Sequence, residues 1–162
     1  MELTVAAGIS VALLTATVLI HFEMFRMASG LTSSQLIPPR GRILLVITVV
    51  LVAHIVEIGL YAAAFAGCQE LLRLGSIDGV VEGGVLDVVY FSITTYTTLG
   101  VEDLHARGPL RLIAGVESLN GLVLIGWSAS FTYLAMERSW GGDRGRGLGP
   151  PLQGRGKGST QG

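Results

Sequence analysis

Long apolar runs separated by short polar segments dominate the pattern along the chain. Residues 3–20 contain no Asp, Glu, Lys, Arg or His, residues 43–66 contain two such residues, and a run over about 112–136 contains one. Each run approaches or exceeds the ~20 apolar residues that cross a ~30 Å hydrocarbon core as a helix. The pattern predicts an all-α membrane protein with three transmembrane helices.

The first run is interpreted as a retained helix rather than a cleaved signal peptide. A signal peptide needs a positively charged start and a small-residue cleavage site. The chain instead opens Met1-Glu2-Leu3, and its first apolar run continues into His21-Phe22-Glu23. We therefore expect a transmembrane helix over residues 1–22 and a loop over 23–42 before the second span.

A shorter apolar segment, residues 85–99, lies between the second and third spans. It is too short to cross a bilayer, and such segments are typically re-entrant or buried. Its Thr and β-branched residues favour a strand in a soluble protein, but a lone strand in a membrane leaves its backbone groups unpaired. The segment therefore predicts a short helix that enters the membrane and returns to the same side.

Composition supports a membrane protein and excludes other classes. Of 162 residues 50% are apolar and only 14% are charged, against roughly 25% charged in soluble domains. A net charge of −1 gives no basic field for nucleic acid, and a single cysteine excludes a disulfide scaffold. Because no nucleophile–base set, nucleotide loop or Cys/His metal spacing is present, an enzyme is not expected.

The last segment, residues 139–162, is rich in Gly and Arg and has no apolar periodicity. It predicts a disordered tail, although its repeated Gly-Arg-Gly leaves RNA or lipid headgroups as an alternative partner. The placement of arginines predicts the orientation. Basic residues are enriched in residues 21–42 and in the tail, whereas residues 67–111 are acidic. We expect the N-terminus outside and the C-terminus inside.

The short segment has a layout suited to cations. A helix over residues 86–96 that dips into the membrane from outside would direct the negative end of its dipole toward the bilayer centre. If the chain returned outward in extended form over residues 97–103, it would expose a file of carbonyl oxygens. Such oxygens replace the hydration shell of a cation in selectivity filters.

Residues 90–100, YFSITTYTTLG, closely resemble the pore helix and filter of the two-helix potassium channel pore family. The resemblance covers roughly residues 20–138. Within the family, the chain is similar to small bacterial members with one additional N-terminal helix. It implies a homotetramer in a bacterial inner membrane, with an outer helix over 43–66, a pore helix over 86–97, a filter over 98–103 and an inner helix over 111–137. It assigns roles to these residues: the pore-helix end to Thr94 and Thr97, the conducting filter to Thr98, Leu99, Gly100 and Val101, the gating hinge to Gly121 and a close-packing contact to Gly126.

The chain departs from this family at the outer filter. Val101 and Glu102 stand where the family has a bracing aromatic and a second glycine. The family's glycine adopts a backbone conformation that costs other residues roughly 1–2 kcal/mol. We therefore expect relaxed selectivity for K⁺ or another monovalent cation, and no cofactor. A non-conducting scaffold or regulatory subunit remains the alternative function.

Glu102 and Asp103 would place eight carboxylates around the outer mouth of a tetramer. Two such charges ~8 Å apart repel by about 2 kcal/mol at an effective dielectric of 20. Bound cations or protons would relieve this repulsion. The carboxylates therefore predict an acidic ring that attracts cations, and their oxygens suit Ca²⁺ or Mg²⁺. The alternative is that both are ordinary loop acids facing water.

Four polar residues inside the predicted spans form a candidate buried cluster. His54 and Glu57 lie three apart, as do Glu117 and Asn120, so each pair shares a helix face. Polar groups deep in a membrane usually face protein or water. We expect His54 and Glu57 to contact Glu117, Asn120 or the pore helix. A proton-sensing role for His54 is a second possibility, and a metal site is disfavoured because too few His or Cys residues are present.

Gly121 and Gly126 equally allow a simpler role, in which small residues let two helices approach each other.

Overall fold

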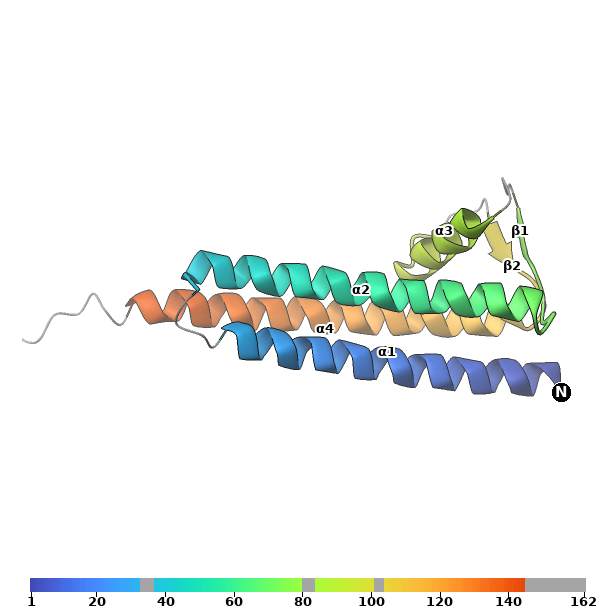
Figure 1. Cartoon of the computed structure of the whole chain (residues 1–162), viewed down its shortest axis with the longest axis horizontal. Coiled ribbons are helices and arrows are strands. Elements are labelled where there is room, and N and C mark those ends of the chain that lie inside the picture. The colour runs from blue at the N-terminus through green and yellow to red at the C-terminus, as the bar shows by residue number, and fades with distance from the viewer. Residues whose placement is uncertain (33–36, 80–83, 101–103, 145–162) are drawn as a thin grey trace, which may run out of the picture.

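A computed structural model gives the fold and describes residues 1–32, 37–79, 84–100 and 104–144. The elements in chain order are α1 (Glu2–Thr32), α2 (Pro39–Glu70), β1 (Ile77–Gly79), α3 (Val85–Tyr96), β2 (Leu104–Ala106) and α4 (Leu110–Arg144). Helices α1, α2 and α4 lie side by side along the long axis, and each packs against the other two (Figure 1). The predicted all-α architecture with three long helices is confirmed.

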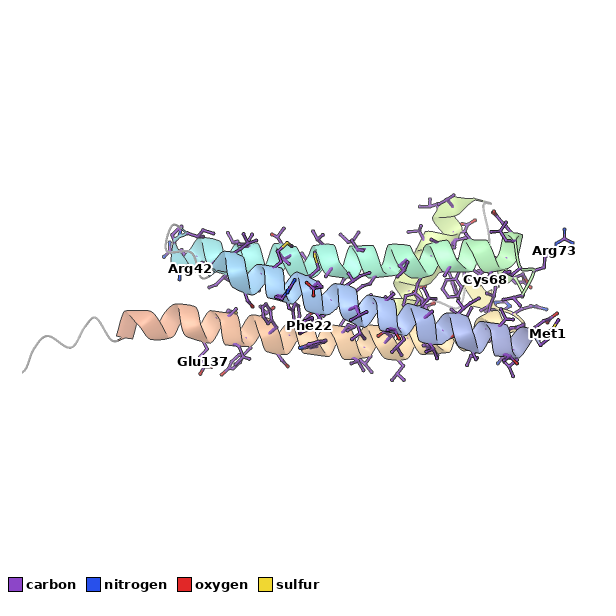
Figure 2. All side chains as sticks on the ribbon, turned by 60° about the horizontal axis from the view of Figure 1, so that its bottom comes forward. Met1, Phe22, Arg42, Cys68, Arg73 and Glu137 are labelled. Atoms are coloured by element: carbon purple, nitrogen blue, oxygen red, sulfur yellow. The ribbon has the colours of Figure 1, made fainter. Side chains whose placement is uncertain are left out.

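The three long helices have the length and composition of membrane spans. Their candidate spans are Glu2–Leu31, Arg40–Glu70 and Leu110–Glu137, and at most 33% of each apolar window is buried within the chain. Figure 2 shows side chains projecting from these helices on all sides. In water this apolar exterior would be strongly unfavourable, so the chain is an integral membrane protein.

Helix α3 lies at one end of the molecule, packed against α2 and α4. It starts near the small hairpin and runs toward the middle of the long helices (Figure 1). The antiparallel strands of the hairpin, β1 and β2, pair Ile77 with Ala106, and Arg107 bonds Asp78 at 2.6 Å. The segment is therefore a re-entrant helix flanked by a hairpin at one membrane surface.

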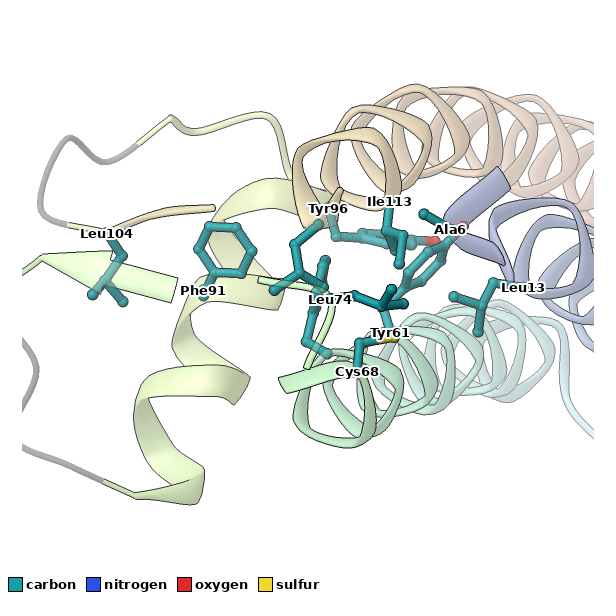
Figure 3. Packing of buried hydrophobic residues seen from close by; sticks show 11 residues of the cluster. Ala6, Leu13, Tyr61, Cys68, Leu74, Phe91, Tyr96, Leu104 and Ile113 are labelled. Atoms are coloured by element: carbon teal, nitrogen blue, oxygen red, sulfur yellow. The ribbon is translucent and has the colours of Figure 1, made fainter. Parts of the chain in front are cut away.

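Two apolar clusters hold the helices together. In the larger cluster, Tyr96 of α3, Ile113 of α4 and Tyr61 of α2 are fully or almost fully buried (Figure 3). In the smaller cluster, Phe25 of α1 stacks on Phe131 of α4 with ring centroids 4.1 Å apart. The contact of Phe25 with Phe131 lies beyond residue 22, and it packs the C-terminal half of α1 against α4.

The long helices extend beyond their predicted boundaries. Helix α2, expected over 43–66, begins at Pro39 and ends at Glu70. Helix α1 continues to Thr32, so residues 23–32 are helical and do not belong to the expected loop. Burial of Phe25 and an ion pair between Glu23 and Arg26 (2.7 Å) stabilise this extension. Helix α4 likewise continues to Arg144, through the first residues of the expected tail. Residues 145–162 lie outside the described part of the chain.

Candidate functional site

The C-terminal end of α3 is closed by backbone hydrogen bonds around Thr98. The N–H of Thr98 donates to the carbonyl of Thr95 (3.0 Å), and that of Leu99 donates to the carbonyl of Thr94 (2.9 Å). Thr98 has a φ of 56°. These two bonds and a left-handed residue define a Schellman motif, in which glycine usually occupies the left-handed position. A threonine therefore ends the pore helix in a conformation that costs roughly 1–2 kcal/mol.

Residues 97–100 follow the pore helix as an exposed run of backbone. Each of them is exposed within the single chain, and Leu99 retains 72% of its accessible surface. Gly100 repeats the left-handed conformation with a φ of 60°. The backbone after α3 is therefore not the extended segment expected from sequence, because the left-handed residues Thr98 and Gly100 turn it.

The hydroxyls at the end of α3 bond within the helix. Thr94 donates to the carbonyl of Phe91 (3.0 Å), and Thr97 donates to that of Ile93 (2.7 Å). An open cavity of about 280 Å³ lies between this end of α3 and α4, lined by Thr94, Thr98 and Ser118 among others. Val101, Glu102 and Asp103 lie outside the described residues, so the outer filter and the acidic ring stay predictions.

Gly121 of α4 is the point where the inner helix meets the pore helix. A Cβ atom at this position would lie 2.1 Å from the carbonyl oxygen of Tyr96, far inside contact distance. At Gly126 a Cβ atom would meet nothing within 4 Å. Within the chain, the close helix approach is therefore made at Gly121, although the expected assignment gave packing to Gly126 and the hinge to Gly121.

Glu57 is fully buried near the middle of α2, and both of its carboxylate oxygens are hydrogen bonded. His21 Nδ1 of α1 lies 2.7 Å from Oε1, and the Tyr96 hydroxyl of α3 lies 2.5 Å from Oε2. His54 Nδ1 lies 3.3 Å from Oε2. The expected contact of His54 and Glu57 with the pore helix is therefore present, and Tyr96 makes it.

Ser128 of α4 and Tyr96 complete a closed hydrogen-bond ring. The Ser128 hydroxyl lies 3.1 Å from His21 Nε2 and 3.0 Å from His54 Nε2. His54 Nδ1 lies 2.9 Å from the Tyr96 hydroxyl. The order around the ring is Glu57, His21, Ser128, His54, Tyr96 and back to Glu57. This five-residue ring takes at least one side chain from each of the four helices.

Glu117 does not join the ring. Its Oε1 lies 2.5 Å from the Ser92 hydroxyl of α3, which also lies 3.0 Å from the carbonyl of Ile58. Its Oε2 is buried and has no hydrogen-bond partner among the described residues. Glu117 therefore joins α4 to α3 and α2 through a separate contact, which meets α2 at the residue after Glu57.

Asn120 forms a third polar contact. Its amide nitrogen lies 2.6 Å from the Thr17 hydroxyl of α1 and 3.2 Å from the Tyr61 hydroxyl of α2. None of the hydrogen bonds among the described residues joins His54 or Glu57 to Glu117 or Asn120. The expected single cluster is therefore wrong in this respect, because the four residues lie in three separate sets of contacts.

Sequence reasoning missed most partners of these residues. His21, Tyr96 and Ser128 complete the ring, and Thr17, Tyr61 and Ser92 satisfy the other two contacts. Their signal was weak: each is a polar residue in an apolar helix, at no recognisable spacing from its partner. His21 in addition stood at the expected end of the first span.

The ring residues His21, His54 and Glu57 also have the donor atoms of a metal site, which lie within 4.8 Å of one another. A tetrahedral site with ~2.0–2.1 Å bonds separates its donors by about 3.3 Å. His21 Nδ1 and Glu57 Oε1 are only 2.7 Å apart, which is a hydrogen-bond distance. The contact between these two atoms is therefore a hydrogen bond and does not have the spacing of two ligands on one tetrahedral metal.

Comparison with known proteins identifies the family. The family model described as "Ion channel" matches residues 43–138, which cover α2, the hairpin, α3 and most of α4. No curated protein and no solved structure matches the chain. The matched region contains the re-entrant helix, its coiled return and the glycine contact of the inner helix, whereas α1 precedes it. The chain belongs to this ion channel family, the two-helix potassium channel pore family that the TTLG-containing segment resembles.

Proposed function

We propose that the protein is a homotetrameric channel that conducts monovalent cations with weak discrimination between K⁺ and Na⁺. The channel family supplies the class of function, which is transport rather than an enzyme reaction. The pore would lie on the axis of the tetramer and be lined by main-chain carbonyls of Thr98, Leu99 and Gly100.

The exposed backbone of residues 97–100 carries this proposal. It follows a helix whose last residue, Tyr96, contacts His54 and Glu57 near the middle of α2, so it lies deep between the spans. Irregular backbone at such depth is tolerated only inside protein or beside water. Copies of the same segment around an axis provide both, because they cover one another and enclose a file of water and ions.

The direction of α3 favours a cation at this place. Its C-terminal end, at Tyr96, points toward the middle of the long helices (Figure 1). The partial negative charge of a helix C-terminus stabilises a nearby cation, typically by 0.3–1 kcal/mol at an exposed site. Four such ends in a tetramer act on the same ion.

Relaxed selectivity follows from the outer filter sequence. Val101 has no aromatic ring to brace the filter, and Glu102 places a Cβ where the family has glycine. A filter held less rigidly discriminates less between ions that differ mainly in size.

The acidic residues Glu102 and Asp103 would concentrate cations at the outer mouth, and Ca²⁺ or Mg²⁺ would compete there with the permeant ion. In this proposal the hairpin and the N-terminus lie on the outer side of a bacterial inner membrane, and the C-terminus lies inside. The N-terminus and the hairpin lie at the same end of the molecule (Figure 1), as this orientation requires.

The oligomeric state is tested by cross-linking the purified full chain in mild detergent. A ladder that ends at four subunits supports the proposed axis. A ladder that stops at two subunits, or monomer alone, contradicts it.

Conduction is tested in planar bilayers with opposed K⁺ and Na⁺ solutions. The proposal predicts cation currents whose reversal potential stays near zero under bi-ionic conditions, and a shift toward the K⁺ potential in the double variant Val101→Tyr/Glu102→Gly. A reversal potential set by K⁺ alone in the parent chain contradicts relaxed selectivity. A stable tetramer without current supports the alternative scaffold function.

A further inference from the structure

The five-residue ring, His21, His54, Glu57, Tyr96 and Ser128, has an unusual hydrogen count. Each of the five contacts around the ring needs one hydrogen atom to be a hydrogen bond, in addition to the longer contact of 3.3 Å that joins His54 Nδ1 to Glu57 Oε2 across it. Neutral His21 and His54 supply one N–H each, and Ser128 and Tyr96 supply one O–H each. An ionised Glu57 supplies none. The ring then has four protons for five contacts.

The position of the unfilled contact depends on which nitrogen of neutral His54 carries its proton. His21 donates through Nδ1 to Glu57, so its Nε2 accepts from Ser128, and Tyr96 donates to Glu57. If His54 carries its proton on Nε2, it donates to Ser128, and its Nδ1 lone pair faces the oxygen of Tyr96. If His54 carries its proton on Nδ1, it donates to Tyr96, and its Nε2 lone pair faces the oxygen of Ser128. With either tautomer, two lone pairs face each other at one contact of His54.

We propose that the ring is a binding site for one additional proton, and that this proton fastens α1 to the pore helices. With the proton on His54 Nδ1, that nitrogen donates to Tyr96, Tyr96 donates to Glu57, and all five contacts become hydrogen bonds. The added positive charge also cancels the charge of Glu57, which is fully buried. An unpaired charge at such a position is strongly unfavourable.

Among the described residues, no Lys or Arg side chain forms an ion pair with the ring. Of the titratable groups that face it, Tyr61 of α2 bonds Asn120 and Glu117 of α4 bonds Ser92. On α1, the nearest charged pair beyond His21 is Glu23 with Arg26, and both of these side chains are more than half exposed. The side chain of His54 is 14% exposed, whereas those of His21 and Glu57 are 0% exposed.

The site couples proton binding to one particular helix. His21 belongs to α1, which lies outside the region matched by the channel family, and the other four members lie within that region. Loss of the proton leaves a defect in the polar contact that joins α1 to α2, α3 and α4. The inference does not depend on conduction, because it concerns only how the helices of the folded chain hold together.

Two variants remove the need for the proton in different ways. Glu57→Gln brings an amide that accepts from His21 and donates toward Tyr96 and His54, so the ring closes without an added proton. Ser128→Ala removes the bridge between the two histidines, which frees His54 to donate through Nδ1. Ser130→Ala is the matched control, because Ser130 is exposed two residues away and bonds only the carbonyl of Gly126 among described groups (3.1 Å).

The test is unfolding of the purified full chain in detergent at several values between about pH 6 and pH 8, the range in which imidazoles ordinarily titrate. If the folded chain holds one more proton than the unfolded chain, its folding equilibrium constant falls up to tenfold per pH unit as the pH rises. The parent and Ser130→Ala should share this fall. In Glu57→Gln and Ser128→Ala the folding equilibrium constant should fall less steeply with pH, by up to a factor of ten for each pH unit.

Equal slopes in the parent and in both ring variants would overturn the inference, as would an absence of pH dependence in the parent. Should Glu57→Gln fail to fold, Ser128→Ala against Ser130→Ala decides the question alone. Each measurement is repeated with EDTA and with added Zn²⁺. Stability of the parent that is lost in EDTA and restored by Zn²⁺ would identify a metal in place of the proton and contradict the inference.

Discussion

Replacing Gly121 by alanine should separate the inner helix from the pore helix. The new Cβ atom would lie 2.1 Å from the carbonyl oxygen of Tyr96, whereas ordinary contacts start at 3.4 Å. The neighbouring group is backbone, so it cannot swing away as a flexible side chain would. Helices α3 and α4 must therefore move apart by about 1.3 Å, the difference between these two distances.

The displacement also affects the hydroxyl of Tyr96, which bonds Glu57 at 2.5 Å and His54 at 2.9 Å. Overpacking costs about 1–3 kcal/mol, and loss of a hydrogen bond to a charged group costs about 1.5–3 kcal/mol. The better helix propensity of alanine offsets about 0.5–1 kcal/mol. We expect Gly121→Ala to lower the free energy of unfolding by about 2–4 kcal/mol per subunit.

The assay is denaturation of the purified protein in detergent, followed by circular dichroism, with Gly126→Ala as the matched control. Gly126 is on the same helix and a Cβ there meets nothing within 4 Å, so this variant should match or slightly exceed the parent. If Gly121→Ala is as stable as Gly126→Ala, the close approach of α3 and α4 at Tyr96 is refuted. A role for Gly121 as a hinge alone would give that result together with altered gating.

Three further substitutions test individual contacts. Thr98→Gly should raise the free energy of unfolding by about 1 kcal/mol, because glycine adopts the left-handed conformation that Thr98 occupies with a φ of 56°; a loss of stability in thermal denaturation would argue against that conformation. Ser92→Ala should lower stability by about 1–3 kcal/mol, because Glu117 is then buried without a partner, and the additional change Glu117→Leu should recover most of the loss in the same measurement. Asn120→Ala should lower stability by about 1 kcal/mol through its lost bonds to Thr17 and Tyr61, and an unchanged denaturation midpoint would show that these bonds contribute nothing.

The main elements of the fold could be predicted because a membrane leaves few alternatives. Backbone groups in lipid must bond internally, so a long apolar run is a helix whatever its intrinsic propensity. The end of α1 was harder to predict, because the residues after Phe22 are more polar than those before. Only the contact of Phe25 with Phe131 on a distant helix shows why the helix continues.

The ring was only half predictable for a related reason. The spacing of His54 and Glu57 indicated one polar face on α2. In soluble proteins an apolar stripe shows which face of the next helix meets it, but helices that are apolar all round carry no such stripe. His21, Tyr96 and Ser128 therefore had no detectable relation to that face until the helices were in place.

The conformation of Thr98 could not be predicted from the sequence at all. A left-handed threonine is disfavoured by roughly 1–2 kcal/mol, so the TTLG segment indicated an extended return. Thr98 adopts this conformation where the pore helix ends, and residues 97–100 are exposed within the single chain. Such a conformation at a functional segment is typical of sites whose surroundings hold them in place.

The central claim, that carbonyl oxygens of Thr98, Leu99 and Gly100 line a cation pathway between four copies of the chain, is tested most directly by the structure of the full-length assembly in Rb⁺. Anomalous scattering locates this K⁺ substitute without reference to the protein coordinates. The account predicts a fourfold axis with Rb⁺ peaks beside these carbonyls. An assembly without that axis, or an axis on which no Rb⁺ lies at the level of residues 98–100, would contradict it.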